Sequence, residues 1–183
     1  MKKNDIIFAI ISGLLVAWLA VDFLGKIGFI FFIIFPIMSI AGLWICDWLG
    51  QKYHFIRQSG RFFLVGAFAD VIDIKIFQVL FWIAPFSLFF KGISFLVATF
   101  VKYWWNKNWA FEKNGKDGIK KEVIQFFAIT LIGLGINIAS FYYFGKINTE
   151  IPAHLWQEIC IILAALVSAI WNFLGYKFIV FKK

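Results

Sequence analysis

Residues 6–24, IIFAIISGLLVAWLAVDFL, and residues 28–49, GFIFFIIFPIMSIAGLWICDWL, decide the fold, because each apolar run is long enough to cross a membrane. A hydrocarbon core of roughly 30 Å needs about 20 mostly apolar residues in a helix. The first run has a basic start, as a signal peptide does, but it continues to Leu24 without a small-residue cleavage pattern. The second run follows almost at once. Together they predict a retained transmembrane hairpin with a tight turn around Gly25.

The rest of the chain contains four more runs of this kind, at residues 62–83, 86–105, 123–144 and 155–174. They are about twice as long as sheet strands and do not alternate strictly between apolar and polar residues, so a β-barrel is a poor match. The mean hydropathy is +0.85, and the spans leave no room in 183 residues for a separate soluble domain. We expect an all-α, polytopic membrane helix bundle of about six transmembrane helices.

The distribution of Lys and Arg predicts the orientation. With the N-terminus in the cytoplasm, most of these residues fall on the cytoplasmic side, Lys26, Lys91 and Lys146 fall on the outer side, and Lys75 lies within a span. Short loops rich in Lys and Arg stay on the cytoplasmic side of a membrane. Both termini are therefore expected in the cytoplasm. The net charge of +8 is interpreted as contact with anionic membrane lipids rather than with nucleic acid.

The hairpins show internal similarity. Residues 105–111, WNKNWAF, share a layout with residues 175–181, GYKFIVF, and the preceding runs open similarly, with RFF from Arg61 and QFF from Gln125. A weaker copy in the first hairpin aligns DWLGQKY, from Asp47, with NFLGYKF, from Asn172. Because each hairpin enters the membrane from the same side, the repeats are predicted to be parallel. Parallel repeats occur in transporters, and they can also arise in purely structural bundles.

These segments resemble a known family. The motifs that carry the resemblance are RFFLVG at 61–66, VID at 71–73, NKNWAF at 106–111, QFF at 125–127, NFL at 172–174 and KFIVF at 177–181. In their order and spacing they resemble the GtrA-like family. The resemblance covers residues 57–183 and implies the four-helix membrane domain of that family. Residues 1–56 are then an additional N-terminal transmembrane hairpin.

The resemblance also implies a function. It indicates a multi-pass protein of a bacterial-type cytoplasmic membrane that takes part in cell-surface polysaccharide or glycolipid synthesis. The expected activity is the flipping of polyprenyl phosphate or a polyprenyl-phosphate-linked monosaccharide, with a membrane glycosyltransferase as the usual partner. The alternative is a non-transporting subunit that anchors and orients a glycosyltransferase. A flippase needs a lateral opening to lipid beside Asp73, an anchoring subunit predicts a closed bundle, and homo-oligomer formation is open for both.

Charged residues within a span cost a few kcal/mol each, so those of the third span are the leading site candidates. Asp70 and Asp73 are three residues apart and share a helix face, whereas Lys75 points away from Asp73. At 1.5 Å per residue, Asp73 lies about 18 Å beyond Arg61, near mid-membrane, and Asn137 is expected at similar depth. These groups form either a hydrophilic pathway for a charged lipid headgroup or an internal ion pair between helices.

A phosphate headgroup needs cations near the membrane surface. The candidates lie near the cytoplasmic ends of the spans: the cations Arg61, Lys102, Lys107 and Lys177, and the polar residues Asp47, Asn106 and Asn172. The positive-inside bias alone would also explain the lysines. The sequence has no phosphate-binding glycine loop, no His-Glu-x-x-His run and no serine-nucleophile motif. No enzymatic activity, catalytic residue, metal or cofactor is therefore expected.

Overall fold

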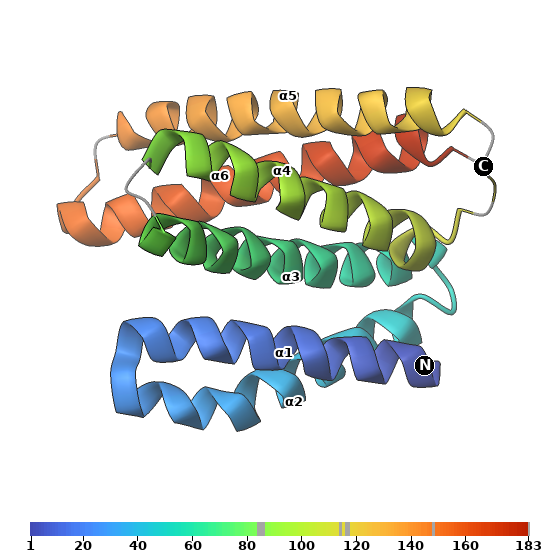
Figure 1. Cartoon of the computed structure of the whole chain (residues 1–183), viewed down its shortest axis with the longest axis horizontal. Coiled ribbons are helices and arrows are strands. Elements are labelled where there is room, and N and C mark those ends of the chain that lie inside the picture. The colour runs from blue at the N-terminus through green and yellow to red at the C-terminus, as the bar shows by residue number, and fades with distance from the viewer. Residues whose placement is uncertain (84–86, 114, 116–117, 148, 183) are drawn as a thin grey trace. The chain divides into compact units, whose positions relative to one another are not determined.

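The computed structural model describes residues 1–83, 87–113, 115, 118–147 and 149–182. Every regular element in these ranges is helical, which confirms the predicted all-α class. The elements follow the order α1 (Lys3–Leu24), η1 (Gly25–Ile30), α2 (Phe31–Leu49), α3 (His54–Ile83), α4 (Ser87–Trp105), η2 (Asn106–Ala110), α5 (Ile119–Gly145), α6 (Ala153–Gly175) and η3 (Tyr176–Val180) (Figure 1).

The α-helices of the described residues coincide with the predicted apolar runs, with two differences. Helix α3 begins at His54, about two turns before the predicted start, because polar residues of its first turns find partners within the protein. The predicted tight turn is a short 3₁₀-helix, η1, which follows a left-handed Gly25 with φ 57°. The predicted start of the fourth run, Phe86, lies outside the described residues.

Three stretches of the described residues are long and apolar enough to cross a membrane: Lys3–Leu49, Ile119–Gly145 and Leu155–Val180. The first contains both α1 and α2. Within hydrocarbon every backbone polar group needs a partner in the chain, and helices supply one. Helices α3 and α4 do not reach this hydropathy because polar and charged residues interrupt them. The protein is therefore a membrane protein, while six spans and cytoplasmic termini remain predictions.

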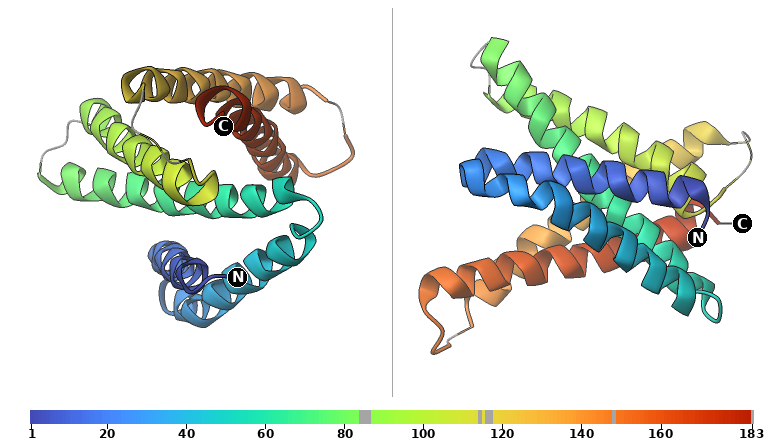
Figure 2. Two further views of the ribbon diagram at one scale, coloured as in Figure 1. Left: turned by 90° about the vertical axis from the view of Figure 1, so that its right-hand side faces the viewer. Right: turned by 90° about the horizontal axis from the view of Figure 1, so that it is seen from below.

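The chain forms two compact units, residues 1–114 and residues 115–183, which we call the first and the second unit and describe separately. In the first unit α1 packs against α2 and α3, α2 also contacts α3, and α4 with η2 covers another side of α3 (Figures 1 and 2). Its core contains Phe8, Leu43 and Trp109. The second unit is the hairpin of α5 and α6, with η3 packed on α5.

The first hairpin depends on a close approach of two backbones. Gly13 of α1 faces Pro36 of α2, and a Cβ at Gly13 would lie 2.5 Å from the Pro36 nitrogen and 2.6 Å from its Cα. Small residues let membrane helices approach to this distance, and the resulting van der Waals contacts stabilise the pair. Any side chain at Gly13 would push α2 away from α1.

We expect Gly13→Ala to lower the free energy of unfolding by about 1–3 kcal/mol, the usual cost of overpacking. Thermal unfolding in detergent measures it. Gly42→Ala in α2 is the matched control, because a Cβ at Gly42 meets nothing within 4 Å. That control should be neutral or slightly stabilising, since Ala favours helix over Gly by about 0.5–1 kcal/mol. Equal effects of the two substitutions would contradict the close packing at Gly13.

Helices α4 and α6 end in the same way. Each continues into a five-residue π-helix, η2 (Asn106–Ala110) after α4 and η3 (Tyr176–Val180) after α6. The following residues, Phe111 and Phe181, donate their backbone N–H groups to the first carbonyl of the π-helix, over 2.9 and 2.7 Å. Such i→i+5 hydrogen bonds are rare and are common at functional sites. The two segments that align in sequence thus also share an unusual local structure.

Candidate functional site: a polar seam between two helices

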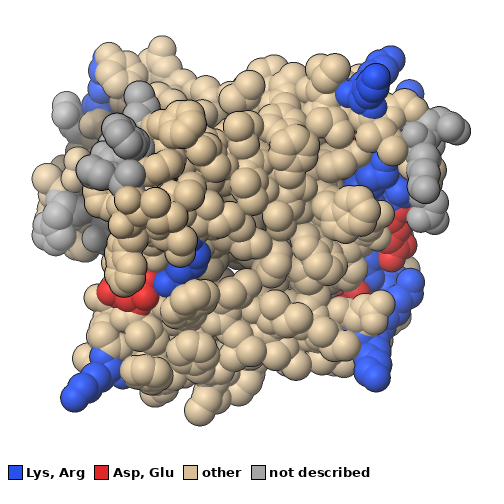
Figure 3. Space-filling model, in the orientation of Figure 1, with Lys and Arg blue, Asp and Glu red and all other residues tan. Residues whose placement is uncertain are grey.

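Charged side chains are few on the helices. Most of the face drawn in Figure 3 is uncharged, and the Lys, Arg, Asp and Glu residues visible on it lie toward its left and right edges. In the first unit, the charged residues of the helices form three groups that differ in burial and in partners. One surrounds Arg61, one joins Lys75 to α1, and one lies between α3 and α4.

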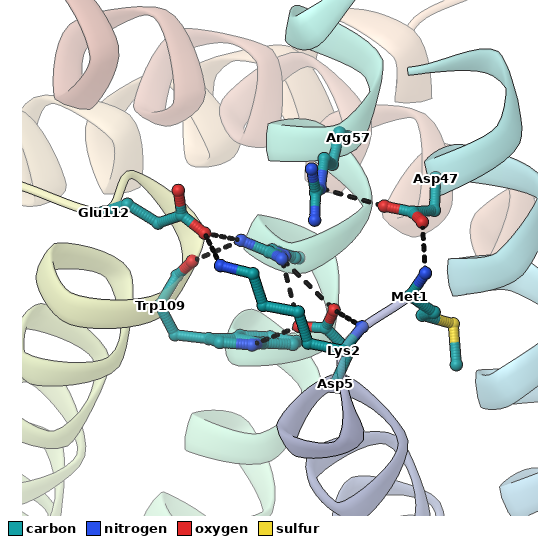
Figure 4. A network of polar contacts seen from close by, with 8 residues as sticks. Met1, Lys2, Asp5, Asp47, Arg57, Trp109 and Glu112 are labelled. Carbon is teal, nitrogen blue, oxygen red and sulfur yellow. Dashed lines mark hydrogen bonds and ion pairs between the residues drawn. The ribbon is translucent and has the colours of Figure 1, made fainter. Parts of the chain in front are cut away.

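The first group surrounds Arg61 near the start of α3 (Figure 4). Its guanidinium donates to Glu112 at 2.6 Å and to the backbone carbonyl of Trp109 at 3.0 Å, and it pairs with Asp5 of α1 at 3.0 Å. Asp5 also accepts hydrogen bonds from the Trp109 indole at 2.8 Å and from the backbone N–H of Lys2 at 2.8 Å. Arg61 is 4% exposed and Asp5 2% exposed. This cluster therefore fixes the start of α1 to α3 and η2.

Glu112 is the more exposed carboxylate of this cluster. Its backbone lies in the left-handed region, with φ 49°, which is uncommon for a residue with a side chain. The hydrogen bond from Arg61 lowers the pKa of Glu112 below its ordinary value, against an opposing effect of burial. The ionised carboxylate therefore stabilises the folded protein.

This pKa shift predicts a pH dependence. Since the pKa of Glu112 is lower in the folded than in the unfolded chain, its contribution is complete above the ordinary pKa of 4.5. It is lost as the pH falls through the lowered, folded-state pKa. We expect Glu112→Gln to be less stable than the native protein near neutral pH, with a difference that shrinks in acid. Chemical unfolding at several pH values measures this difference, and a gap that does not change with pH would contradict the ion pair.

Asp47, a predicted polar position, lies at the end of α2. Its carboxylate pairs with Arg57 of α3 at 2.9 Å and with the amino group of Met1 at 2.7 Å (Figure 4). The side chains of Asp47 and Arg57 are 20% and 30% exposed, so water still reaches this pair. The structure places Asp47 in a contact between helices.

The second group contains Lys75 of α3. Its ammonium pairs with Asp22 of α1 and lies 4.1 Å from the centre of the Trp18 ring. Gln78, one turn further along α3, donates to the same carboxylate at 3.4 Å. Lys75 thus does not pair with Asp73, as the helix geometry predicts, and it joins α3 to α1. Asp22 was not among the predicted site residues.

The third group lies between α3 and α4. Asp73 of α3 accepts a hydrogen bond from the Ser94 hydroxyl at 2.6 Å and pairs with the Lys91 ammonium at 2.5 Å. Asp70, one helical turn before Asp73, is exposed and within electrostatic range of Asp73, Lys91 and Lys102. We name these five residues, Asp70, Asp73, Lys91, Ser94 and Lys102, the α3–α4 seam.

The seam has a regular basis in the sequence. Lys91, Ser94 and Lys102 recur at helical spacing, so they share one face of α4, and Asp70 and Asp73 share one face of α3. From Lys91 to Lys102 the seam covers about 16 Å of helix. Cations at both ends and carboxylates between them make a continuous polar surface. Such a surface is expensive in hydrocarbon unless it is paired or meets polar ligands.

The cytoplasmic end of the seam continues into η2. Asn106 is completely buried, and its amide nitrogen donates to the carbonyl of Lys102 at 2.8 Å. Its amide oxygen is buried without a hydrogen-bond partner in the described part of the chain. Lys107 is 7% exposed, and its ammonium lies 3.4 Å from the Tyr103 hydroxyl. The sequence predicted both residues as site candidates, and the structure places them in a rare helix geometry.

The remaining predicted residues, Asn137, Asn172 and Lys177, lie in the second unit. Asn172 is buried, and its amide packs so closely on Gly133 that a Cβ there would lie 2.8 Å from the amide nitrogen. Asn137 is half-buried in α5, and the Lys177 ammonium lies 5.6 Å from the ring centre of Phe178. The structure does not gather these three side chains into one site.

Sequence reasoning missed four functional neighbours: Asp5, Asp22, Ser94 and Glu112. Lys91 had been counted on the outer side, and it lies one turn inside α4 with its ammonium on Asp73. Charge counting cannot find such pairs because it uses only Lys and Arg. A usable signal was present, since each intramembrane cation needs a carboxylate nearby and the chain has only ten acidic residues.

A comparison with protein families matches residues 61–181 to the GtrA/DPMS transmembrane domain. This range contains α4, α5 and α6 with most of α3, and hence the whole α3–α4 seam. It begins after α1 and α2. No curated protein and no solved structure matches the chain.

Proposed function

Because the chain belongs to the GtrA/DPMS transmembrane-domain family, whose members are membrane proteins involved in handling sugar lipids for glycosylation, we propose that it is a flippase. Its substrate is polyprenyl phosphate or a polyprenyl-phosphate-linked monosaccharide, and its site of action is a bacterial-type cytoplasmic membrane. The observation that carries the proposal is the α3–α4 seam, a row of charged and hydroxyl groups on two otherwise apolar helices.

The chemistry of the seam suits a lipid headgroup. A phosphate or a sugar cannot cross hydrocarbon unless polar groups replace its water. Lys102 and Lys91 offer cations at the two ends of the seam, and Asp70 and Asp73 offer acceptors for sugar hydroxyls between them. Asp70 is exposed, so the seam has an accessible side. The polyprenyl chain stays in the bilayer while the headgroup moves along the two helices.

The proposal divides the predicted phosphate ligands into two sets. Lys102 and Lys107 are proposed to receive the phosphate at the cytoplasmic end, beside the unpartnered amide oxygen of Asn106. Arg61 already bonds two carboxylates and a carbonyl, so we propose that it holds the additional hairpin rather than substrate. Lys177 and the second unit are proposed to take part in the same pathway through their repeat relation to the first.

The proposed topology has six spans with both termini in the cytoplasm, where a membrane glycosyltransferase loads the lipid. Ion pairs bury some of the charges, which lowers the cost of keeping them in the bilayer. No nucleotide hydrolysis by this chain is part of the mechanism. The concentration difference of the lipid between leaflets supplies the driving force.

Purified protein in liposomes tests the function. A labelled polyprenyl-phosphate monosaccharide is placed in one leaflet, and its arrival in the other is followed in protein-containing and empty liposomes. The proposal expects faster transfer with protein and no acceleration for a phospholipid with the same label. Transfer no faster than in empty liposomes, even with the partner glycosyltransferase present, would favour the alternative of a non-transporting anchoring subunit.

A further inference from the structure

A groove of about 410 Å³ lies in the first unit, where α1 meets α3, the end of α4 and η2. The buried rings of Phe8 and Trp109 contribute to its lining, and their centres are 4.2 Å apart. Ile7, Ile11 and Trp105 also line it, and both isoleucines are more than 40% exposed. The groove is of the size of common small-ligand sites. Its apolar lining suits hydrocarbon.

One end of the groove is polar. The amides of Asn4, in the first turn of α1, and Asn108, in η2, line it there. The Asn108 amide nitrogen is used by the carbonyl of Trp104, at 2.9 Å, which leaves its oxygen as an acceptor. Lys3 is exposed and precedes Ile7 by four residues, so it lies on the same face of α1. A cation and two amides therefore adjoin an apolar groove.

This arrangement fits one class of ligand, a lipid with a small anionic headgroup. We propose that the groove binds polyprenyl phosphate, with the first isoprene units against Ile7, Ile11 and Trp105 and the phosphate beside Lys3 and Asn108. The choice of this lipid rests on the proposed function. The site itself does not, because half of its lining comes from α1, outside the family domain at 61–181. It is also separate from the α3–α4 seam.

The four α1 residues of the lining explain how the site arises. Asn4, Ile7, Phe8 and Ile11 recur at spacings of three and four, so they form one stripe of about 10 Å along the helix. The Arg61 cluster holds the start of α1 against η2 and thereby keeps the two sides of the groove together. The additional hairpin thus supplies a lipid-binding site at the cytoplasmic end of the chain.

Native mass spectrometry of the purified full chain with polyprenyl phosphate tests the site. Ile11→Trp fills the groove and is expected to bind polyprenyl phosphate about tenfold more weakly. Ile10→Trp is the matched control, because Ile10 is a similarly exposed neighbour that does not line the groove. Lys3→Glu changes only an exposed charge, and it should weaken binding of polyprenyl phosphate while leaving uncharged polyprenol unaffected.

The outcomes separate this proposal from the transport proposal. Equal binding by the native protein, Ile11→Trp and Lys3→Glu would overturn the site, whether or not the protein moves lipid. Equal displacement by phosphatidylglycerol would also overturn it, since the groove would then be an ordinary lipid contact. A dimer that disappears in Ile11→Trp would assign the groove to a second copy and overturn it too. Selective binding that both variants lose would support the site even if the liposomes show no transfer.

Discussion

Replacing Arg61 with Ala is expected to lower the free energy of unfolding by about 3–5 kcal/mol, the usual cost of leaving a buried charge without its partner. Asp5 is almost completely buried and pairs with this guanidinium, and Glu112 loses its strongest donor. The carbonyl of Trp109 also loses a hydrogen bond. Thermal or denaturant unfolding in detergent micelles measures the change.

Arg57→Ala is the matched control for this substitution. It removes the same type of side chain one turn earlier on α3, but its ion pair with Asp47 is partly exposed. Such pairs contribute about 0–1 kcal/mol, so the loss should be several times smaller. The double substitution Asp5→Asn with Arg61→Met should recover part of the stability, because it removes both charges. Similar losses for Arg61→Ala and Arg57→Ala would contradict the burial of the cluster.

Replacing Asp73 with Asn is expected to reduce lipid transfer in liposomes by about tenfold or more, equivalent to at least about 1.4 kcal/mol. The substitution keeps an oxygen for the Ser94 hydroxyl and removes the charge opposite Lys91. The α3–α4 seam would then lose one carboxylate and keep an unpaired cation. Transfer rates of native and variant protein in liposomes of equal protein content provide the measurement.

A double variant separates transport from folding. Asp73→Asn together with Lys91→Met leaves no unpaired charge at this position, so its stability should approach that of the native protein. If the seam carries the headgroup, transfer by the double variant stays low although the protein is stable. Full recovery of transfer along with stability would assign the pair a purely structural role and contradict the transport proposal.

Much of the fold follows from the sequence alone. Long apolar runs can satisfy their backbone only as helices in a bilayer, and each predicted run contains an α-helix of the described residues. The π-helices could not be predicted, because a shift from i→i+4 to i→i+5 bonding leaves little trace in composition. The early start of α3 was missed because residues 54–61 are too polar to count as a span.

The candidate site was predictable in part. The cost of charge in hydrocarbon identifies Asp70, Asp73 and Lys75 without any structure. Their partners depend on which helices become neighbours and at what register, and a sequence does not encode this in local spacing. The pairs formed by Asp73 with Lys91 and by Lys75 with α1 therefore emerged only from the packing.

The two ion pairs between α1 and α3 have a mechanical consequence. Asp5 binds Arg61 and Asp22 binds Lys75, so the attachments are about 25 Å apart on α1 and about 21 Å apart on α3. Two widely separated attachments resist both sliding and rotation, whereas a single one would allow a hinge. Helices α1 and α3 are therefore expected to move as one rigid body. Any motion that opens a path for a headgroup must occur on the opposite side of α3, where it meets α4.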